Sequence, residues 1–213
     1  MLKAFYLLLI VSFFLSQTLL AKHQKIIVAT DSWPPFRIHK DDHMTGIDFD
    51  IWAEIGKRLD LKITFKKYPW SRILHNLKTG EVDAMSGLAK TKERAKYITY
   101  VIPLYYTCSA VFYLKKGEGH LIKTYEDLYK YPIAYVSNSA YFKKFDNDEK
   151  LKKHPIYSEI QLLKMLKNNR IKVIIGTNCQ IDYEIEKLGL TSSFEKAYYK
   201  PSNSSDLDRK SVV

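Results

Sequence analysis

The stretch from Gly80 to Arg94 contains residues of the types that bind a small anion. Residues 82–85 are mostly apolar and predict a short buried strand, which Ser86-Gly87 would end. Thr91 can then cap a helical turn that includes Arg94. The start of a helix attracts anions, and a guanidinium holds a carboxylate through two parallel hydrogen bonds. The stretch therefore predicts either an anion site at Ser86, Gly87 and Arg94, or an ordinary turn whose arginine makes a surface ion pair.

Two tryptophans follow predicted strands and can form the walls of the same site. Asp31 and Trp33 lie in a loop that contains two prolines, and this loop comes directly after a β-branched run, Lys25–Thr30. Trp70 opens a predicted helix, and Arg72 is a second candidate anion contact. Aromatic faces suit apolar or cationic parts of a ligand. Alternatively, Trp33 only closes the edge of the domain.

The elements in the first half of the chain are expected to bring these residues together. Ile47, Ile51, Ile55 and Leu59 recur every four residues and predict a helix with one apolar face, with Trp52 beside it as a core residue. A strand is expected at residues 61–66 and a helix from residue 70 to about Gly80. The resulting order, strand–loop–helix–strand–helix–strand, is typical of a parallel sheet, where ligands bind beyond the carboxyl ends of the strands.

The second half repeats this pattern after a long aromatic segment, residues 97–114. Residues 115–119 include two glycines and predict a flexible link. Strands are expected at residues 131–136 and 171–175, and helices near residues 160–166 and 181–188. Ser139 and Thr177 follow the two strands, so both are candidates for the site; alternatively, Ser139 only caps a helix.

The composition indicates a folded, exported protein. The chain has 213 residues, 46% of them hydrophobic and 14% aromatic, and a formal net charge of +11. Its lysines are scattered in pairs among acids and tyrosines, which does not favour nucleic-acid binding. Lys3, the apolar run from Ala4 to Leu15 and the small residue Ala21 have the layout of a signal peptide, residues 1–21, although an uncleaved anchor is the alternative.

Neither the cysteines nor the histidines predict a metal site. Export permits a disulfide between Cys108 and Cys179, but the apolar surroundings of Cys108 favour a buried thiol. Four histidines lie after residue 40 without the spacing of metal ligands. No metal and no cofactor are expected.

Four motifs in the same order carry a family resemblance. They are Trp33-Pro34-Pro35-Phe36, Gly46-Ile47-Asp48-Phe49-Asp50, the run from Leu77 to Ala84 with Gly80-Glu81-Val82-Asp83, and Thr91-x-Glu93-Arg94. Together they resemble the bacterial extracellular solute-binding proteins of family 3, the polar amino-acid receptors of ABC transporters, over about residues 25–200.

The resemblance implies an α/β protein of the type II periplasmic binding class, with two hinged lobes and a mainly parallel sheet in each. Lobe 1 would span residues 22–114, lobe 2 residues 115–198, and residues 199–213 would begin a return crossing that stays incomplete. The implied function is delivery of a small, carboxylate-bearing ligand to an ABC permease in the periplasm, without catalysis. Ser139 would be the second clamp on the carboxylate.

The chain departs from the family pattern where such receptors bind the ligand's ammonium group. An aspartate usually lies near Thr177, but Thr177 and Asn178 are neutral, and Ala89 replaces a usual hydroxyl residue. A buried ammonium needs a compensating charge, so Asp31 or Asp182 would have to supply it.

Two other functions remain open on this scaffold. A cyclic-acid dehydratase would need an acid/base pair, for which Asp31, Asp48 and Asp50 are the candidates. A ligand-sensing domain would bind the same kind of ligand without serving a permease.

Overall fold

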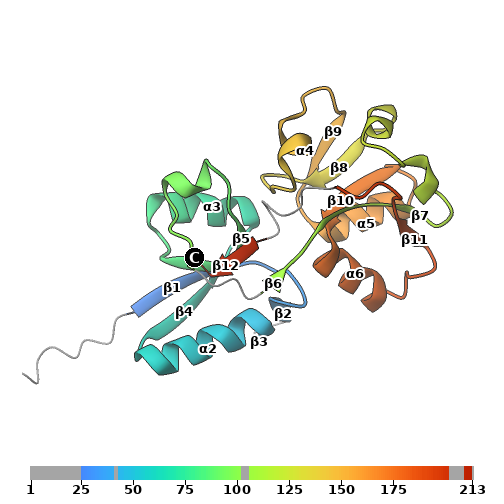
Figure 1. The fold of residues 1–213 in the computed structure, drawn as a ribbon. Coiled ribbons are helices and arrows are strands. Elements are labelled where there is room, and N and C mark those ends of the chain that lie inside the picture. The colour runs from blue at the N-terminus through green and yellow to red at the C-terminus, as the bar shows by residue number, and fades with distance from the viewer. Residues whose placement is uncertain (1–24, 41–42, 102–105, 202–208, 213) are drawn as a thin grey trace, which may run out of the picture.

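The structure is a computed structural model that describes residues 25–40, 43–101, 106–201 and 209–212. It has two lobes, each built on a five-stranded sheet with helices on both faces (Figure 1). The expected α/β class with two mainly parallel sheets is confirmed. The predicted signal peptide at residues 1–21 lies outside the described residues.

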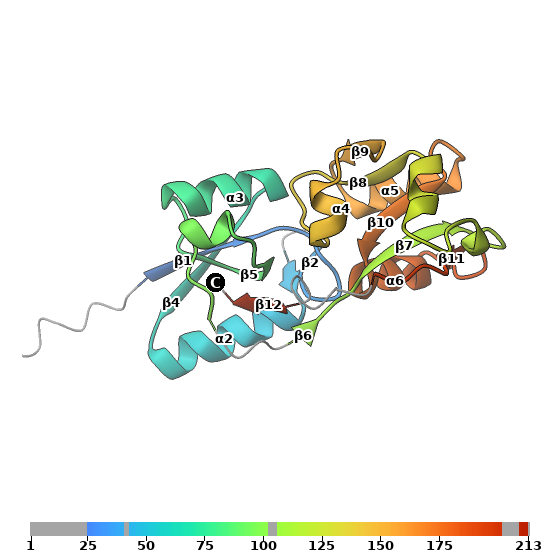
Figure 2. The same cartoon turned by 45° about the horizontal axis from the view of Figure 1, so that its top comes forward.

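The first sheet has the order β4-β1-β5-β12-β6. Its strands are β1 (Lys25–Thr30), β4 (Lys62–Lys67), β5 (Ala84–Ala89), β6 (Tyr106–Thr107) and β12 (Arg209–Val212). β1 is parallel to β4 and β5, whereas β12 is antiparallel to β5 and β6. Side chains of β1 alternate between α2 (Ile47–Leu59) and α3 (Trp70–Thr79), which cover opposite faces of the sheet (Figure 2).

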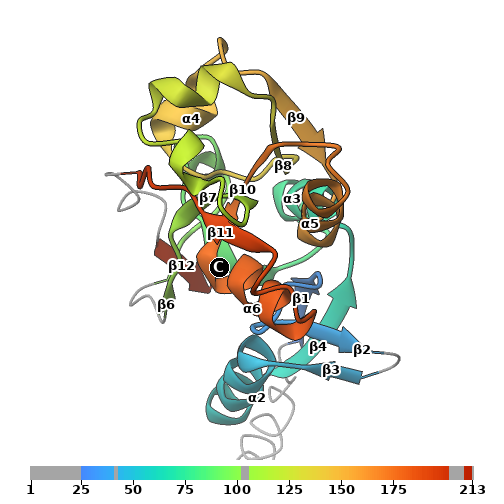
Figure 3. The ribbon, with the colours of Figure 1, turned by 90° about the vertical axis from the view of Figure 1, so that its right-hand side faces the viewer.

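The second sheet has the order β11-β7-β10-β8-β9. Its strands are β7 (Ala110–Lys115), β8 (Ile133–Val136), β9 (Lys153–Ile156), β10 (Val173–Thr177) and β11 (Phe194–Lys196). The helices α5 (Glu159–Lys167) and α6 (Asn178–Lys187) pack on one face, and α4 (Lys143–Asn147) lies on the other (Figure 3).

Short elements complete the described chain. A hairpin of β2 (Ile38–Lys40) and β3 (His43–Thr45) encloses the turn predicted around residues 41–42, which lies outside the described residues. The 3₁₀ turns are η1 (Arg94–Lys96), η2 (Gly119–Leu121) and η3 (Glu126–Lys130).

The helix α2 has the predicted length but buries a different face. Its buried residues are Asp48, Phe49, Trp52 and Gly56. Ile47 and Leu59, which were expected in the core, are 45% and 64% exposed. They are the first and last residues of the helix. Trp52 is a core residue, as predicted.

Two predictions about the junction between the lobes are wrong. β7, which was assigned to the first lobe, pairs with β10 and β11 in the second, because its side chains are apolar on both faces and fill a sheet covered on both sides. The predicted flexible link, residues 115–119, is also fixed to the second lobe: the backbone N–H of Lys116 donates to Ser193, and Gly119 bonds to Glu195. The described crossing from the first lobe to the second is at residues 108–109.

The polar residues at the end of the chain were not expected to form a strand. Residues 209–212 nevertheless form β12, whose backbone groups pair with β5 and β6. Backbone hydrogen bonds of this kind do not require an apolar sequence. Residues 209–212 therefore belong to the sheet of the first lobe.

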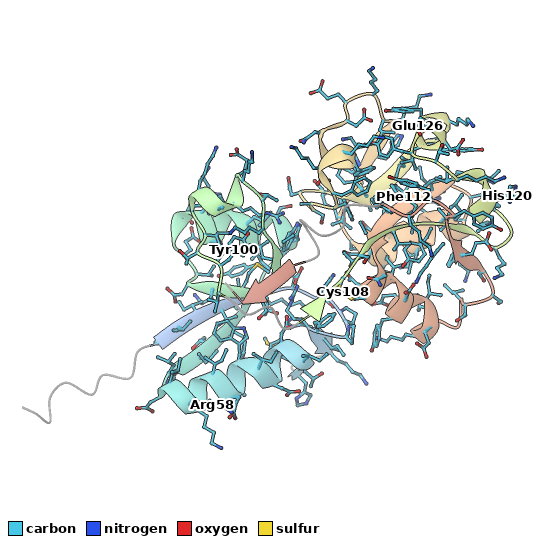
Figure 4. The ribbon with its side chains drawn as sticks, viewed as in Figure 1. Arg58, Tyr100, Cys108, Phe112, His120 and Glu126 are labelled. Atoms are coloured by element: carbon cyan, nitrogen blue, oxygen red, sulfur yellow. A yellow bond between two sulfur atoms is a disulfide. The ribbon has the colours of Figure 1, made fainter. Side chains whose placement is uncertain are left out.

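Cys108 and Cys179 form a disulfide, so the expected buried thiol is wrong. Their Cα atoms are 5.6 Å apart, within the ordinary range for such a bond. Cys108 lies at the crossing between the lobes (Figure 4), and Cys179 lies in the first turn of α6. Within the described ranges, no helix has the length and apolar character to cross a membrane.

Candidate functional site

A cavity of about 510 Å³ lies between the lobes, at the carboxyl ends of strands from both sheets. The first lobe lines it after β1 and β4, along β5 and at η1, and the second lobe lines it after β8, β9 and β10. This position agrees with the prediction from the order of the elements. Seven of the nine predicted site residues line the cavity: Asp31, Trp33, Trp70, Gly87, Arg94, Ser139 and Thr177.

Arg94 is a buried cation in the cavity wall. Its side chain donates hydrogen bonds of 2.8 Å to the carbonyls of Ala89 and Asn138, and the ring of Trp70 lies 5.5 Å from its guanidinium. Arg94 is only 7% exposed, and burial lowers the pKa of its guanidinium because desolvation disfavours the charged form. No carboxylate in the described ranges forms an ion pair with it. The surface ion pair considered as an alternative is therefore wrong.

The helical turn that contains Arg94 is capped as predicted, but the strand before it ends later than predicted. The Thr91 hydroxyl accepts a hydrogen bond of 3.1 Å from the Arg94 backbone N–H, which confirms the cap. The strand, however, does not end at Ser86-Gly87 but continues to Ala89, because β12 supplies a pairing partner for its second half.

The proline-containing loop after β1 holds an ion-pair network that the sequence analysis did not predict. Arg37 donates to Asp31 at 2.9 Å through Nε and lies 2.7 Å from Asp48 through Nη1. Nη1 also donates to the carbonyl of Ser86. Gly46 permits this arrangement, because at its φ of +119° a Cβ would lie 2.4 Å from the carbonyl oxygen of Phe36.

The two tryptophans both line the cavity from the first lobe. Trp33 stacks on Phe36 with ring centroids 4.8 Å apart, and the disulfide packs beside this pair. Trp70 packs against the cores of both lobes, and its indole N–H is buried without a hydrogen-bond partner among the described residues. Each ring thus contributes to the packing as well as to the cavity wall.

The structure does not place Ser86 and Arg72 in the cavity. The Ser86 hydroxyl accepts a hydrogen bond of 2.7 Å from the Trp52 indole in the core, because this side chain points to the α2 face of β5. Arg72 is exposed on α3, beyond the first turn that lines the cavity. Neither can contact a ligand in this arrangement.

The second lobe contributes mostly neutral groups. Ser139 lies four residues before α4, whose cap residue is Phe142, so a helix-capping role for Ser139 is wrong. The Thr177 hydroxyl is buried without a hydrogen-bond partner among the described residues. Tyr157 and Glu159, at the end of β9, line the cavity and were not predicted.

The two acids considered as partners for a ligand's ammonium group already have protein partners. Asp31 is paired with Arg37. Asp182 accepts a hydrogen bond from Tyr113 and pairs with Lys196 at 2.6 Å, outside the cavity. Of the acids considered for an acid/base pair, Asp48 is fully engaged in the core and Asp50 is exposed on α2.

Asp146 is an acid of the second lobe whose ionisation is perturbed by burial. Burial raises its pKa to about 6, although the backbone N–H of Tyr141 and the charges of Lys153 and Arg94 oppose this shift. The described residues contain no cluster of histidine, cysteine or acidic side chains that could hold a metal ion.

These features define an α/β binding protein with a ligand-sized cavity between two lobes. Residues 26–198 match the model of the bacterial extracellular solute-binding proteins, family 3, and the chain belongs to this family. The family consists of solute-binding proteins, not enzymes, and it is extracellular.

Relatives of known name support the assignment. The chain is 30% identical over 162 residues to the arginine-binding periplasmic protein of Mannheimia haemolytica, covering 73% of this chain and 64% of that protein. It is 28% identical to the ABC transporter arginine-binding protein 1 of Escherichia coli, covering 71% and 62%. The chain thus spans less than two thirds of the length of these relatives.

Solved structures show the same fold. The amino acid ABC transporter substrate-binding protein AbpA from Streptococcus pneumoniae, bound to L-arginine, aligns with a TM-score of 0.75 at 18% identity, over 89% of this chain and 81% of that chain.

Proposed function

We propose that this protein binds a small polar ligand with a carboxylate, an amino acid or a related acid, and delivers it to an ABC permease. The observation that carries the proposal is Arg94, a buried guanidinium in the cavity wall without an acidic partner in the described ranges. A buried charge is costly unless it is paired, and a ligand carboxylate would pair it.

Other cavity residues support a polar ligand. The Thr177 hydroxyl and the Trp70 indole N–H have no hydrogen-bond partner among the described residues, and each costs about 1–3 kcal/mol when unsatisfied. Ser139 follows β8 on the opposite wall and can donate a further hydrogen bond to the carboxylate. Trp33 and Trp70, which both line the cavity, would enclose the ligand body.

The first ligand to test and the location of the protein are also part of the proposal. The relatives are named for arginine binding, and arginine is therefore the first ligand to test. Residues 1–21 would be removed as a signal peptide, which places the mature protein in the periplasm, where a permease partner would receive the ligand.

A thermal-shift screen of the mature chain against amino acids and organic acids tests the proposal. At least one ligand with a carboxylate should raise the melting temperature, and matched compounds with an amide in place of the carboxylate should not. Arg94→Ala should weaken binding, measured by calorimetry, by two orders of magnitude or more while the protein stays folded. Unchanged affinity in Arg94→Ala would remove Arg94 from the site.

Tryptophan fluorescence gives a second readout. Ligand binding should change the emission, and replacement of Trp33 or Trp70 by phenylalanine should remove part of the change. A response that survives both replacements would come from Trp52 and would contradict their place at the ligand.

A further inference from the structure

Asn138, in the loop after β8, forms two hydrogen bonds with the first lobe. The Arg94 guanidinium donates a hydrogen bond of 2.8 Å to the backbone carbonyl of Asn138. The Asn138 side chain donates a second one, of 3.0 Å, to the hydroxyl of Ser71 in the first turn of α3. Asn138 thus joins two separate parts of the first lobe to the second lobe.

The loop that presents Asn138 is fixed on its own lobe. The backbone N–H of Ser137 donates to Ile156 at 2.8 Å, and that of Ser139 donates to Val136 at 3.1 Å. Asn138 has a φ of +60°, in the left-handed region that asparagine and glycine adopt most readily. The position of its carbonyl therefore depends on the second lobe, whereas both of its partners belong to the first.

We propose that Asn138 is a latch that favours the closed arrangement of the two lobes and sets the apparent ligand affinity. Both of its interlobe hydrogen bonds require that the lobes lie together. Loss of a bond that exists only in the closed state shifts the population toward the open state, and apparent affinity falls with the closed fraction. The effect on ligand rests on the proposed function, since it assumes that the cavity binds ligand when closed.

Asn138 acts through other residues and not by touching the ligand. It does not line the cavity, whereas its neighbour Ser139 and its partner Arg94 do. The Asn138 carbonyl takes one Nη2 donor and the Ala89 carbonyl takes one Nη1 donor, so the guanidinium is held from both lobes. Asn138 is therefore a positioning residue for Arg94.

The test measures the interlobe distance in the full mature chain without ligand. Spin labels carried by non-canonical amino acids at the exposed positions Lys57 and Glu186, one in each lobe, leave the disulfide intact and report the distance by double electron–electron resonance. Asn138→Gly keeps the backbone conformation and the carbonyl but removes the side-chain bond, and Ser71→Ala removes the same bond from the other side. Each should lower the ratio of closed to open molecules about two- to tenfold, and the double variant should lower it no further.

Two more variants separate the effect of the Asn138 side-chain hydrogen bond from the effect of its backbone conformation. Asn138→Ala should shift the ratio more than Asn138→Gly, because alanine disfavours the left-handed backbone that positions the carbonyl for Arg94. Asn169→Gly is the matched control: Asn169 is also a left-handed asparagine (φ +56°), and it lies exposed on the second lobe after α5. It should leave the distances unchanged, and circular dichroism should show that all variants are folded.

The latch is wrong if Asn138→Gly and Ser71→Ala change the distances no more than Asn169→Gly does. Failure of the proposed function has a different signature: no carboxylate ligand shifts the distances or the melting temperature of the parent protein, whatever the variants do. If ligand binds the parent, the apparent affinity of Asn138→Gly should fall in proportion to its fraction of closed molecules.

Discussion

The two lobes bury different kinds of side chain. In the first lobe, charged and polar groups such as Arg37, Asp48 and Ser86 are buried beside a small apolar core. In the second lobe, the two larger clusters are mostly aromatic and aliphatic, and one of them contains Phe112 (Figure 4). Phe112, for example, packs edge-on against both Phe142 and Phe145.

The two lobes also supply different groups to the cavity wall. The first lobe supplies the cations of the cavity wall, Arg37, Lys67 and Arg94, and its buried polar groups fix some of them in place. The second lobe supplies mostly neutral groups on strand ends that an apolar core holds rigidly. Charges held before the ligand arrives need no reorganisation when it binds, which favours specific recognition.

The largest effect that distinguishes the lobes is expected at Arg37. Arg37→Ala leaves the carboxylate of Asp48, 2% exposed, buried beside the vacated position, and should cost about 3–5 kcal/mol of unfolding free energy in urea. Arg58→Ala is the control, because its pair with Glu54 is on the surface and is worth at most about 1 kcal/mol. Equal losses in the two variants would contradict an ionic core in the first lobe.

Removal of the disulfide tests the junction between the lobes. The bond closes a loop with a sequence separation of 71, and the double variant Cys108→Ser, Cys179→Ser should lose about 2–4 kcal/mol of unfolding free energy. Two hydrogen bonds should keep the crossing in place: the Ser109 backbone N–H donates to the Asn178 side-chain oxygen, and the Asn178 backbone N–H donates to the Ser109 carbonyl. The near-ultraviolet spectrum of the folded variant should therefore stay close to that of the parent, and a lost spectrum would show that the bond alone holds the junction.

Ser86→Ala tests whether the Ser86 hydroxyl stabilises the core or binds the ligand. The change leaves the Trp52 indole N–H buried without its acceptor and should cost about 1–3 kcal/mol. Ligand affinity, measured by calorimetry, should stay within twofold of the parent. A large loss of affinity with unchanged stability would return Ser86 to the ligand site.

Asp146 is a polar exception in the second lobe and should give a pH dependence. Its folded pKa of about 6 lies above the ordinary value of 3.8, so the folded state holds this proton more tightly. Its contribution to stability is therefore present below about pH 4 and is lost as the pH rises to about 6. Because the site is partly solvated, the contribution of Asp146 to the free energy of unfolding should be only about 1–2 kcal/mol smaller at pH 7 than at pH 4. Asp146→Asn should remove this part of the slope in urea titrations, and an unchanged slope would show that Asp146 ionises freely.

Much of the fold follows from local sequence patterns. The β-branched run Lys25–Thr30 forms β1 with the predicted bounds, and the helix at residues 47–59 begins after Gly46 as expected. The face of that helix was not predictable from its apolar residues. Asp48 turns inward because Arg37, eleven residues earlier, neutralises it, and no periodicity encodes that pairing.

The candidate site was predictable where it depends on strand ends and not where it depends on side-chain pairing. Arg94 and Thr177 follow from their places after β5 and at the end of β10. The choice between Arg72 and Arg37 needed the tertiary structure, since both are arginines near predicted strand ends. The only signal for Arg37 was its position directly after the proline-containing loop. The disulfide likewise needed the geometry of the crossing.

The position of β12 has a consequence for the order of folding. All strands of the second sheet lie within residues 110–196, so that sheet can form from one uninterrupted segment. The first sheet places β12 between β5 and β6. In the sequence, the whole second lobe lies between β12 and both of these strands. Pairing of such distant segments is slow, because the entropy of closing the loop is lost before the contacts form. The second lobe should therefore fold early and the first lobe should be completed last, so that the ligand cavity becomes available only at the final step of folding.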